Sequence, residues 1–558
     1  MKRTLALLSS LFALASCMGQ PLNKKINFTH QDTLRGSVGP ERAWWDVVHY
    51  DVAVTPDYDS RSIRGKTIIT YRVLPGQQSD YLQIDLQKPL TVDTIFYDGK
   101  MYINYPGKPF YNEGNVWHIP LPRAKTGSTH SVAVSYHGNP RVAAYAPWDG
   151  GWIFTKDAHG RPWMTVACQG LGASVWFPCK DHQSDEPDSG ATLTISVPDT
   201  LVAVGNGKLK NKISEDGVSS YTWEVKNPIN NYTIIPYIGK YVSWTDTLQG
   251  EKGILPLEYW VLDYDLQKAK DQFRQVKPML RAFEYWFGPY PFYEDGYKLV
   301  ESSHLGMEHQ SAVAYGNGFE NGYRAGNSFI DLSGSGWGKK WDYIIVHESG
   351  HEWFGNNITT KDIADMWVHE GFTDYSETLF IEYYYGRKAA DEYVQGLRKN
   401  IANDRPIIGP YGVNHEGSGD MYFKGANLLH TIRQVIDNDS IFRQILRGLN
   451  RDFYHQTVTS RQVETYMSQK SGKDLSKIFD QYLRTNQVPV LEINFGKEAD
   501  KTFKLRWQNA VAGFNMPVKF TNGVWAAPTD KWTTVEKKGW DRSHIQVDKN
   551  FYINIKLD

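Results

Sequence analysis

Cysteine is scarce in this sequence, with only three among 558 residues. Cys17 lies near the start, so Cys168 and Cys179 are the only pair in the body of the chain. A dense disulfide framework is therefore excluded, and a chain of this size can rely on its hydrophobic cores. The pair could form one bridge, but it lies in one strand-like and one turn-like run. We expect two buried free thiols, because buried cysteine commonly acts as a small apolar side chain.

A surplus of either charge is also missing. The 61 lysines and arginines nearly balance 62 aspartates and glutamates, which leaves a net charge of −1. A nucleic-acid-binding protein needs a basic excess or a basic patch to neutralise phosphates, and the sequence has neither a basic stripe nor a nucleic-acid motif. We therefore expect no nucleic-acid partner. The composition, 41% hydrophobic and 14% aromatic, is typical of a packed globular protein.

Long hydrophobic runs are absent as well. No stretch after the first twenty residues reaches eighteen apolar residues, so no membrane-spanning helix is expected. The chain starts with Met1-Lys2-Arg3 and continues with an apolar run from Leu5 to Ala15. This run is too short to span a bilayer and is typical of a secretory signal.

The signal segment ends in Leu14-Ala15-Ser16-Cys17, which resembles the lipobox of bacterial lipoproteins, where the cysteine becomes the lipid-bearing first residue. An ordinary signal peptide with small residues near its cleavage site is the alternative. We expect a lipoprotein-type signal peptide over residues 1–17 and a polar tether over 18–44. The protein would then be an exported lipoprotein of the cell envelope, facing the periplasm or held at the outer membrane, or else a secreted protein. The lipid would be its only contact with a membrane.

Three regions of different pattern follow the tether. Residues 45–247 hold alternating runs separated by Gly, Pro, Asn and Asp clusters, which predicts a large antiparallel β-domain. Residues 248–487 carry apolar residues at helical spacing and predict a mostly helical domain. Residues 488–558 return to short alternating runs and predict a small β-sandwich. The expected fold class is multidomain α+β, with about three domains.

The strongest chemical signal is the segment His347-Glu348-Ser349-Gly350-His351. On a helix, His347 and His351 lie one turn apart on the same face, where two imidazole nitrogens can bind one Zn²⁺. Glu348 would border that metal without binding it and could accept a proton from the attacking water. The alternative is a surface helix with two solvated histidines.

A catalytic zinc usually has a third protein ligand. Glu370 lies nineteen residues after His351 and is the candidate. The continuation found in metzincins is excluded, because Phe354 and Asn357 occupy the places of its glycine and its third histidine.

With these residues the chain resembles the gluzincin aminopeptidases, the family of aminopeptidase N and leukotriene hydrolase. That family carries His-Glu-x-x-His, eighteen further residues and then Glu, and residues 347–370 keep this spacing. Trp353-Phe354-Gly355-Asn356 and the segment Trp367-Val368-His369-Glu370-Gly371-Phe372 match its motifs too. The resemblance covers about residue 46 to the C-terminus, without the long helical C-terminal domain that many members carry.

Three more motifs follow the family order with some departures. Leu305-Gly306-Met307-Glu308-His309 resembles the family's Gly-Ala-Met-Glu-Asn or Gly-Gly-Met-Glu-Asn, from which Leu305 and His309 depart. Tyr422-Phe423-Lys424-Gly425 resembles Tyr-Glu-Lys-Gly, from which Phe423 departs. Gln169 and the segment Trp176-Phe177-Pro178-Cys179-Lys180-Asp181 resemble the family's glutamine-containing segment in the β-domain.

The resemblance implies a thermolysin-like catalytic domain, one Zn²⁺ per chain and an aminopeptidase that acts on peptides with a free N-terminus. The implied zinc ligands are His347, His351 and Glu370, and the implied general base is Glu348. Glu308 and Gln169 would bind the ammonium group of the substrate, and Tyr422 would donate a hydrogen bond to the oxyanion. Glu377 would accept a hydrogen bond from one of the ligand histidines. Two alternatives stay open: lipid-epoxide hydrolysis on the same zinc site, and a non-catalytic peptide-binding homologue.

Overall fold

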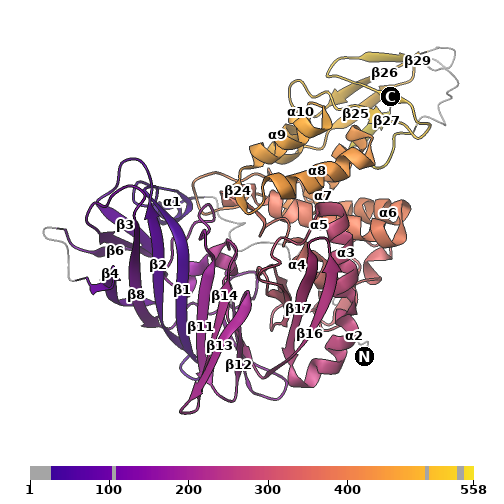
Figure 1. Cartoon of the computed structure of the whole chain (residues 1–558). Helices are drawn as coiled ribbons and strands as arrows, with labels where there is room; N and C mark the ends of the chain where they lie inside the picture. The colour runs from indigo at the N-terminus through magenta and orange to yellow at the C-terminus, as the bar shows by residue number, and fades with distance from the viewer. Residues whose placement is uncertain (1–26, 103–107, 497–501, 537–545, 558) are drawn as a thin grey trace, which may run out of the picture.

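The computed structural model describes residues 27–102, 108–496, 502–536 and 546–557 (Figure 1). The signal segment and Cys17 lie outside these residues. Within them, no helix combines the length and the apolar character that crossing a bilayer requires. Cys168 and Cys179 are both buried free thiols.

The N-terminal part is built on an eight-stranded sheet with the order β13-β14-β11-β1-β2-β8-β4-β5. Its strands are β1 (Trp45–Asp57), β2 (Ser62–Val73), β4 (Thr91–Tyr97), β5 (Lys100–Met101), β8 (Thr129–Gly138), β11 (Ala191–Pro198), β13 (Lys208–Glu215) and β14 (Val218–Val225). Burial alternates along β1, so that Val52 and Val54 face the core while Ala53 is exposed. β1 pairs antiparallel with β2 but parallel with β11. The sheet is therefore mixed and not purely antiparallel, because the chain passes through a second sheet between β8 and β11.

Two smaller sheets complete this part. The first has the order β12-β15-β10-β9 and the second the order β3-β7-β6. Their strands are β9 (Gly151–Lys156), β10 (Pro162–Ala167), β12 (Val202–Val204), β15 (Tyr237–Gly239), β3 (Tyr81–Asp85), β6 (Tyr111–Glu113) and β7 (Val116–Pro120). β10 ends at Ala167, directly before Cys168 and Gln169, so a buried strand delivers the predicted glutamine.

The second part of the chain, predicted to be catalytic and called the catalytic part below, begins with a five-stranded sheet of order β16-β17-β18-β20-β19. Its strands are β16 (Tyr241–Gly250), β17 (Gly253–Leu262), β18 (Tyr297–Glu301), β19 (Gly306–Met307) and β20 (Val313–Tyr315). β16 pairs along its whole length with β17. The expected boundary at residue 247 therefore falls inside a strand, and the chain enters this part at about residue 241.

Helices form the rest of the catalytic part; α2, α3 and α6 lie on the side away from the N-terminal sheets, whereas α4 lies nearer to them (Figure 1). They are α2 (Leu266–Gln272), α3 (Val276–Phe287), α4 (Tyr343–Gly350), α5 (Trp367–Tyr385), α6 (Arg387–Leu397), α7 (Phe423–Ile436), α8 (Asp439–Asp452), α9 (Ser460–Ser471) and α10 (Ser476–Arg484). The same part also contains two two-stranded sheets: β21 (Tyr323–Ala325) with β22 (Ser328–Ile330), and β23 (Ile358–Thr360) with β24 (Gln456–Val458).

The C-terminal region is β-structured, as expected, and lies beyond α9 and α10 (Figure 1). A sheet of order β29-β26-β25-β30 accompanies a β27–β28 ladder. The strands are β25 (Val490–Asn494), β26 (Thr502–Gln508), β27 (Val518–Lys519), β28 (Trp525–Ala526), β29 (Thr533–Glu536) and β30 (Asn554–Leu557). Leu491, Phe503 and Trp507 belong to the same hydrophobic core as the catalytic helices. The described fold thus confirms the multidomain α+β class.

The segment before β1 differs from the expected tether. Helix α1 (His30–Gly36) forms in it, and Thr29 and Asp32 close a capping box at its N-terminus. Arg42 is fully buried. Residues 27–44 therefore pack against the folded body, and the rest of the expected tether, residues 18–26, lies outside the described residues.

Candidate active site

Helix α4 presents the first two predicted residues. Its N-cap Asp342 accepts hydrogen bonds from the backbone N–H groups of Ile344 (3.1 Å) and Ile345 (3.3 Å), which fixes where the helix begins. His347 lies in the last turn, and His351 follows at the C-cap with helical backbone angles. The spacing of four therefore brings both rings to one face, with centroids 5.1 Å apart.

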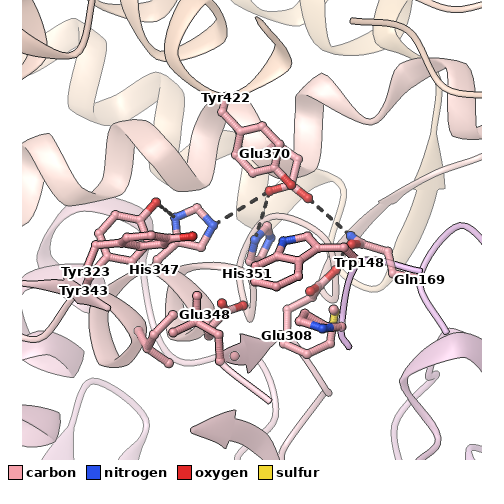
Figure 2. Close-up of a pocket in the computed structure, with 15 residues that line it drawn as sticks. Trp148, Gln169, Glu308, Tyr323, Tyr343, His347, Glu348, His351, Glu370 and Tyr422 are labelled. Atoms are coloured by element: carbon pink, nitrogen blue, oxygen red, sulfur yellow. Dashed lines mark hydrogen bonds and ion pairs between the residues drawn. The ribbon is translucent and has the colours of Figure 1, made fainter. Parts of the chain in front are cut away.

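Glu370 reaches the two histidines from the first turn of α5. Its Oε2 lies 3.3 Å from His351 Nε2 and 3.8 Å from His347 Nε2 (Figure 2). All three side chains are buried. The structure thus brings together the three residues predicted as zinc ligands from the spacing of the motif.

The hydrogen bonds of the two histidines leave their inner nitrogens free to bind a cation. His347 Nδ1 donates to Glu377 Oε1 (2.7 Å) and His351 Nδ1 donates to the Phe354 carbonyl (3.0 Å). Both of these partners can only accept, so the protons lie on Nδ1 and both Nε2 lone pairs face Glu370. Two lone pairs and a buried carboxylate oxygen that face one another need a positive charge between them. A set of two imidazoles and one carboxylate suits Zn²⁺.

Glu377 and Tyr343 hold His347 from behind. Glu377, two turns after Glu370 on α5, is fully buried, and its Oε2 accepts a hydrogen bond from the hydroxyl of Tyr393 (2.6 Å) on α6. The ring of Tyr343 stacks on that of His347, with centroids 5.1 Å apart. Glu377 therefore occupies the predicted position. Tyr343 was not predicted, although its place four residues before His347 puts it on the same helix face.

Glu348 lies on the side of the zinc cluster that faces Glu308. One carboxylate oxygen of each and a ring nitrogen of His351 all lie within 4.8 Å of one another. A Cβ at Gly306 would come within 2.5 Å of Glu348 Oε1, so the carboxylate rests directly on this backbone. Burial raises the pKa of Glu348 to about 7, against the opposing effect of His347. Glu348 therefore borders the metal cluster without belonging to it.

Glu308 is held by donors from the N-terminal part. Gln169 Nε2 donates to Glu308 Oε1 (2.5 Å) and to Glu370 Oε1 (3.2 Å), and the Tyr232 hydroxyl donates to Glu308 Oε1 (2.9 Å). Asn356, in the segment that follows α4, donates a hydrogen bond to the backbone carbonyl of Glu308 (2.9 Å). The structure joins Glu308 and Gln169 as predicted. It adds Tyr232, which no motif marks in the sequence and which only the fold brings near.

Tyr422 reaches the cavity from the N-cap of α7, and its half-buried ring stacks against that of His347 with centroids 6.2 Å apart. Two glycines allow α7 to come this close to α5. A Cβ at Gly425 would lie 2.9 Å from Gly371 Cα, and one at Gly371 would lie 3.0 Å from the Met421 carbonyl. Each glycine belongs to a motif that also supplies a site residue, Tyr422 in one and Glu370 in the other. The crossing of the two helices therefore sets the distance between these side chains.

These residues line a cavity of about 700 Å³, open space included, between the two parts of the chain. Trp148 and Gln169 lie at the end that Glu308 occupies, and Tyr323 and Tyr343 lie at the end near His347 (Figure 2). Apolar side chains fill the remaining wall: Pro147, Leu305, Met307 and Ile344. No sequence motif marks Trp148 or Tyr323, because each comes from a loop or strand outside the zinc motif.

Two protein-family models match this chain. The model described as "Peptidase family M1 domain" matches residues 291–482, and "Peptidase M1 N-terminal domain" matches residues 47–233. Among curated proteins, leukotriene A-4 hydrolase of Xenopus laevis is 24% identical, over 77% of this chain and 68% of its own length. Aminopeptidase Ey of Gallus gallus is 23% identical, over 67% and 40%, and aminopeptidase 2 of Candida albicans is 21% identical, over 80% and 48%. This chain thus spans less than half the length of the two aminopeptidases.

Solved structures share the fold. The M1 zinc metallopeptidase of Deinococcus radiodurans aligns with a TM-score of 0.64 at 20% identity, over 79% of this chain and 94% of that one. A variant of the same enzyme bound to a Tyr-Ser-Ala substrate aligns with a TM-score of 0.62 at 20% identity, over 80% of this chain and 97% of that one. The alignment therefore covers nearly the whole of these neighbours.

Proposed function

Because the chain belongs to the M1 family of zinc metallopeptidases, we propose that it is an aminopeptidase, which removes residues from the free N-terminus of peptides. The observation that carries the proposal is the position of Glu308. This buried carboxylate lies at one end of the cavity, beside the zinc cluster, with Gln169 and Tyr232 fixed against it. A cationic chain end bound there would stop the substrate one residue from the metal.

The chemistry follows from the positions of the chain's own residues. His347, His351 and Glu370 would hold Zn²⁺, which when bound polarises the scissile carbonyl and makes water a better nucleophile. Glu348 takes the proton from the attacking water and passes it to the departing amine. Tyr422, across the cluster, donates its hydroxyl to the oxyanion of the tetrahedral intermediate. Glu377 keeps the proton of His347 on Nδ1, so that Nε2 stays a metal ligand.

The cleavage position is set by Glu308 and not by the hydrolytic groups. The ammonium of an unblocked substrate makes a charge-assisted hydrogen bond with Glu308, worth roughly 1.5–3 kcal/mol. An acetylated substrate would leave this carboxylate desolvated and without a countercharge, which costs more than the bond gains. The enzyme should therefore discriminate strongly against blocked N-termini.

The cavity wall favours an apolar or aromatic N-terminal residue. Trp148, Leu305, Tyr323 and Ile344 offer apolar surface, and no lysine or arginine is among the described residues that line the cavity. The lining glutamates, Glu308, Glu348 and Glu370, already have roles with the ammonium, the proton and the metal. An acidic side chain would find no partner there, and burying it unpaired is costly.

A panel of aminoacyl-coumarin substrates, measured with and without a metal chelator, tests the proposal. Chelator-sensitive release from unblocked leucine, phenylalanine or tyrosine substrates is expected, with far slower release from their N-acetylated forms. Equal cleavage of free and acetylated peptides would refute the aminopeptidase assignment and leave only the assignment as a zinc peptidase. Hydrolysis of a lipid epoxide without aminopeptidase activity would favour the leukotriene-hydrolase alternative, and no activity with zinc bound would favour a binding protein.

We further propose that the protein is exported and carries a lipid on Cys17. The support is the cationic start, the short apolar run and the lipobox-like end of residues 1–17. The active site would then face away from the cytoplasm, and the anchored enzyme would act on peptides outside the cell membrane.

A further inference from the structure

Helix α1 lies where the N-terminal β part meets the catalytic part (Figure 1). It is only seven residues long, and none of its residues is fully buried, so its own packing cannot explain its place. Polar contacts hold it on both sides. Gln31 exchanges two hydrogen bonds with the β6–β7 hairpin, donating to the Glu113 carbonyl (3.0 Å) and accepting from the Asn115 N–H (3.2 Å).

The last turn of α1 contacts the turn that carries Gln169. Arg35 Nη2 donates to the Gly170 carbonyl (3.3 Å), and Arg35 Nε lies 3.4 Å from the buried Asp181 carboxylate. The guanidinium fills the space beside Gly172, because a Cβ there would lie only 1.9 Å from Arg35 Nη2. Arg35 therefore contacts the turn at two of its glycines.

That turn is tight and needs support. Gly170 and Gly172 both have positive φ angles, of 71° and 95°. The Gly172 N–H donates to the Cys168 carbonyl (2.6 Å) and the Leu171 N–H to the Gln169 carbonyl (2.8 Å). Glycine loses more freedom than other residues when it is ordered, so a turn with two glycines depends on outside contacts. Arg35 supplies one of these contacts, one residue from Gln169.

The other side of α1 touches the catalytic part. The Asn414 N–H donates to the Asp32 carbonyl (3.1 Å), and Asn414 Nδ2 donates to the same Gly170 carbonyl that Arg35 binds (3.3 Å). A Cβ at Gly36 would lie 2.1 Å from the Val413 carbonyl carbon, so the two backbones are in direct contact. The Gly170 carbonyl thus accepts hydrogen bonds from α1 and from the catalytic part.

We propose that Arg35 is a positioning residue for the amino terminus of the substrate. It holds the 168–172 turn so that the Gln169 amide meets Glu308, and α1 fastens this turn to the catalytic part through Asn414. The inference rests on the proposed function, since it assigns Gln169 to the ammonium of an aminopeptidase substrate. Residues 27–44, which lie outside the zinc motif, would then contribute to substrate binding.

The test is a double-mutant cycle between Arg35→Ala and Gln169→Ala in the zinc-loaded, full-length enzyme. Arg35→Ala should raise KM for an unblocked leucyl substrate about three- to tenfold, with kcat within about twofold, as expected when hydrogen bonds that position a binding group are lost. In the Gln169→Ala background the same change should have no further effect on KM. Arg123→Ala is the matched control, because Arg123 is a 74% exposed arginine of the same β part.

A second readout does not depend on catalysis. In the metal-free chain, amide hydrogen exchange of residues 168–172 should be faster in Arg35→Ala than in wild type and unchanged in Arg123→Ala. Arg35→Lys keeps a charge beside Asp181 without the planar fork, so it should be intermediate in KM, and it replaces the alanine variant if that one does not fold.

Three results would overturn the positioning role: additive KM effects in the cycle, a lower melting temperature with unchanged KM, or unchanged exchange at residues 168–172. A wild-type enzyme without aminopeptidase activity would instead refute the proposed function. The exchange measurement would still decide whether Arg35 orders the turn.

Discussion

Glu348 and Glu370 are both buried glutamates of one cavity, and their neighbours separate their roles. Glu370 Oε2 faces the Nε2 atoms of His347 and His351, whereas Glu348 rests on the Gly306 backbone and points toward the space that substrate would occupy. A residue type alone therefore does not decide between ligand and base. The direction of approach decides it, because α4 and α5 bring the two carboxylates to different sides of the histidines.

Glu348→Gln separates the proposed general base from the metal ligands. Glutamine keeps the shape of the side chain but cannot take a proton, so zinc should stay bound while kcat falls about 10²–10⁴-fold, the usual contribution of a general base. Metal analysis and steady-state kinetics on the same preparation measure both quantities. His351→Ala is the contrasting variant and should lose metal and activity together. Near-normal turnover in Glu348→Gln would mean that another group is the base.

Tyr422→Phe tests the oxyanion donor. The variant keeps the ring that stacks on His347 and removes only the hydroxyl. If that hydroxyl serves the transition state, kcat should fall about 10²–10³-fold with KM little changed. A rise in KM at constant kcat would show that Tyr422 binds the ground state instead. Tyr323→Phe is the control, because it removes a hydroxyl from another tyrosine that lines the same cavity.

Spacing and motif led to the predicted metal ligands and ammonium-binding groups, which the structure brings together, but not to all of the residues that support them. Glu377 was predictable because a helix places it two turns from Glu370. Tyr232 was not, because it lies 76 residues before Glu308 and meets it only in the fold. Arg35 was hidden for the same reason, since it contacts the turn that carries Gln169 through Gly170, which lies 135 residues further along the chain. Contacts of this range leave no local pattern in a sequence.

At the scale of elements, the crossing of α5 and α7 determines how Glu370 and Tyr422 lie relative to each other. The sequence predicted helices here but gave no measure of how closely they pack. Gly371 and Gly425 provide it, because they meet where any side chain would separate the two backbones. The glycines that follow Glu370 and Tyr422 in their motifs therefore have a packing role, which brings the predicted metal ligand and the proposed oxyanion donor onto facing helices.

Gly425→Ala should accordingly push α7 away from α5. The added methyl would lie 2.9 Å from Gly371 Cα, and a backbone atom cannot rotate aside. Overpacking of this kind costs about 1–3 kcal/mol of stability, and the shift should lower kcat more than KM because it moves Tyr422. Thermal unfolding and kinetics measure the two effects. Gly39→Ala, where the added methyl meets nothing within 4 Å, is the matched control and should change neither. Unchanged kcat in Gly425→Ala would show that the spacing between α5 and α7 does not control turnover.

At the scale of the whole molecule, the sequence predicted the order of the regions better than their limits. Alternation and helical spacing are local signals, so they indicated β, then helix, then β structure. The parallel pairing of β1 with β11 joins strands that lie far apart in the sequence. The β16–β17 hairpin is local, but it enters the catalytic sheet only through the parallel pairing of β17 with the more distant β18. Residues 27–44 carry no strong period, and their packing follows from polar contacts such as those of Gln31 and Arg42.

The position of α1 also bears on the proposed anchor. Twelve residues lie between Cys17 and His30, and a fully extended chain over this stretch reaches at most about 45 Å. A lipid on Cys17 would therefore hold the enzyme close to the membrane, because the chain is fixed to the folded body from α1 onward. Labelling with a fatty-acid analogue should mark the wild-type protein and not Cys17→Ala, which should be released in soluble form with unchanged kcat and KM. Equal labelling of both proteins would refute the lipid anchor, whereas loss of activity in Cys17→Ala would show that the residues before α1 also contribute to the fold of the enzyme.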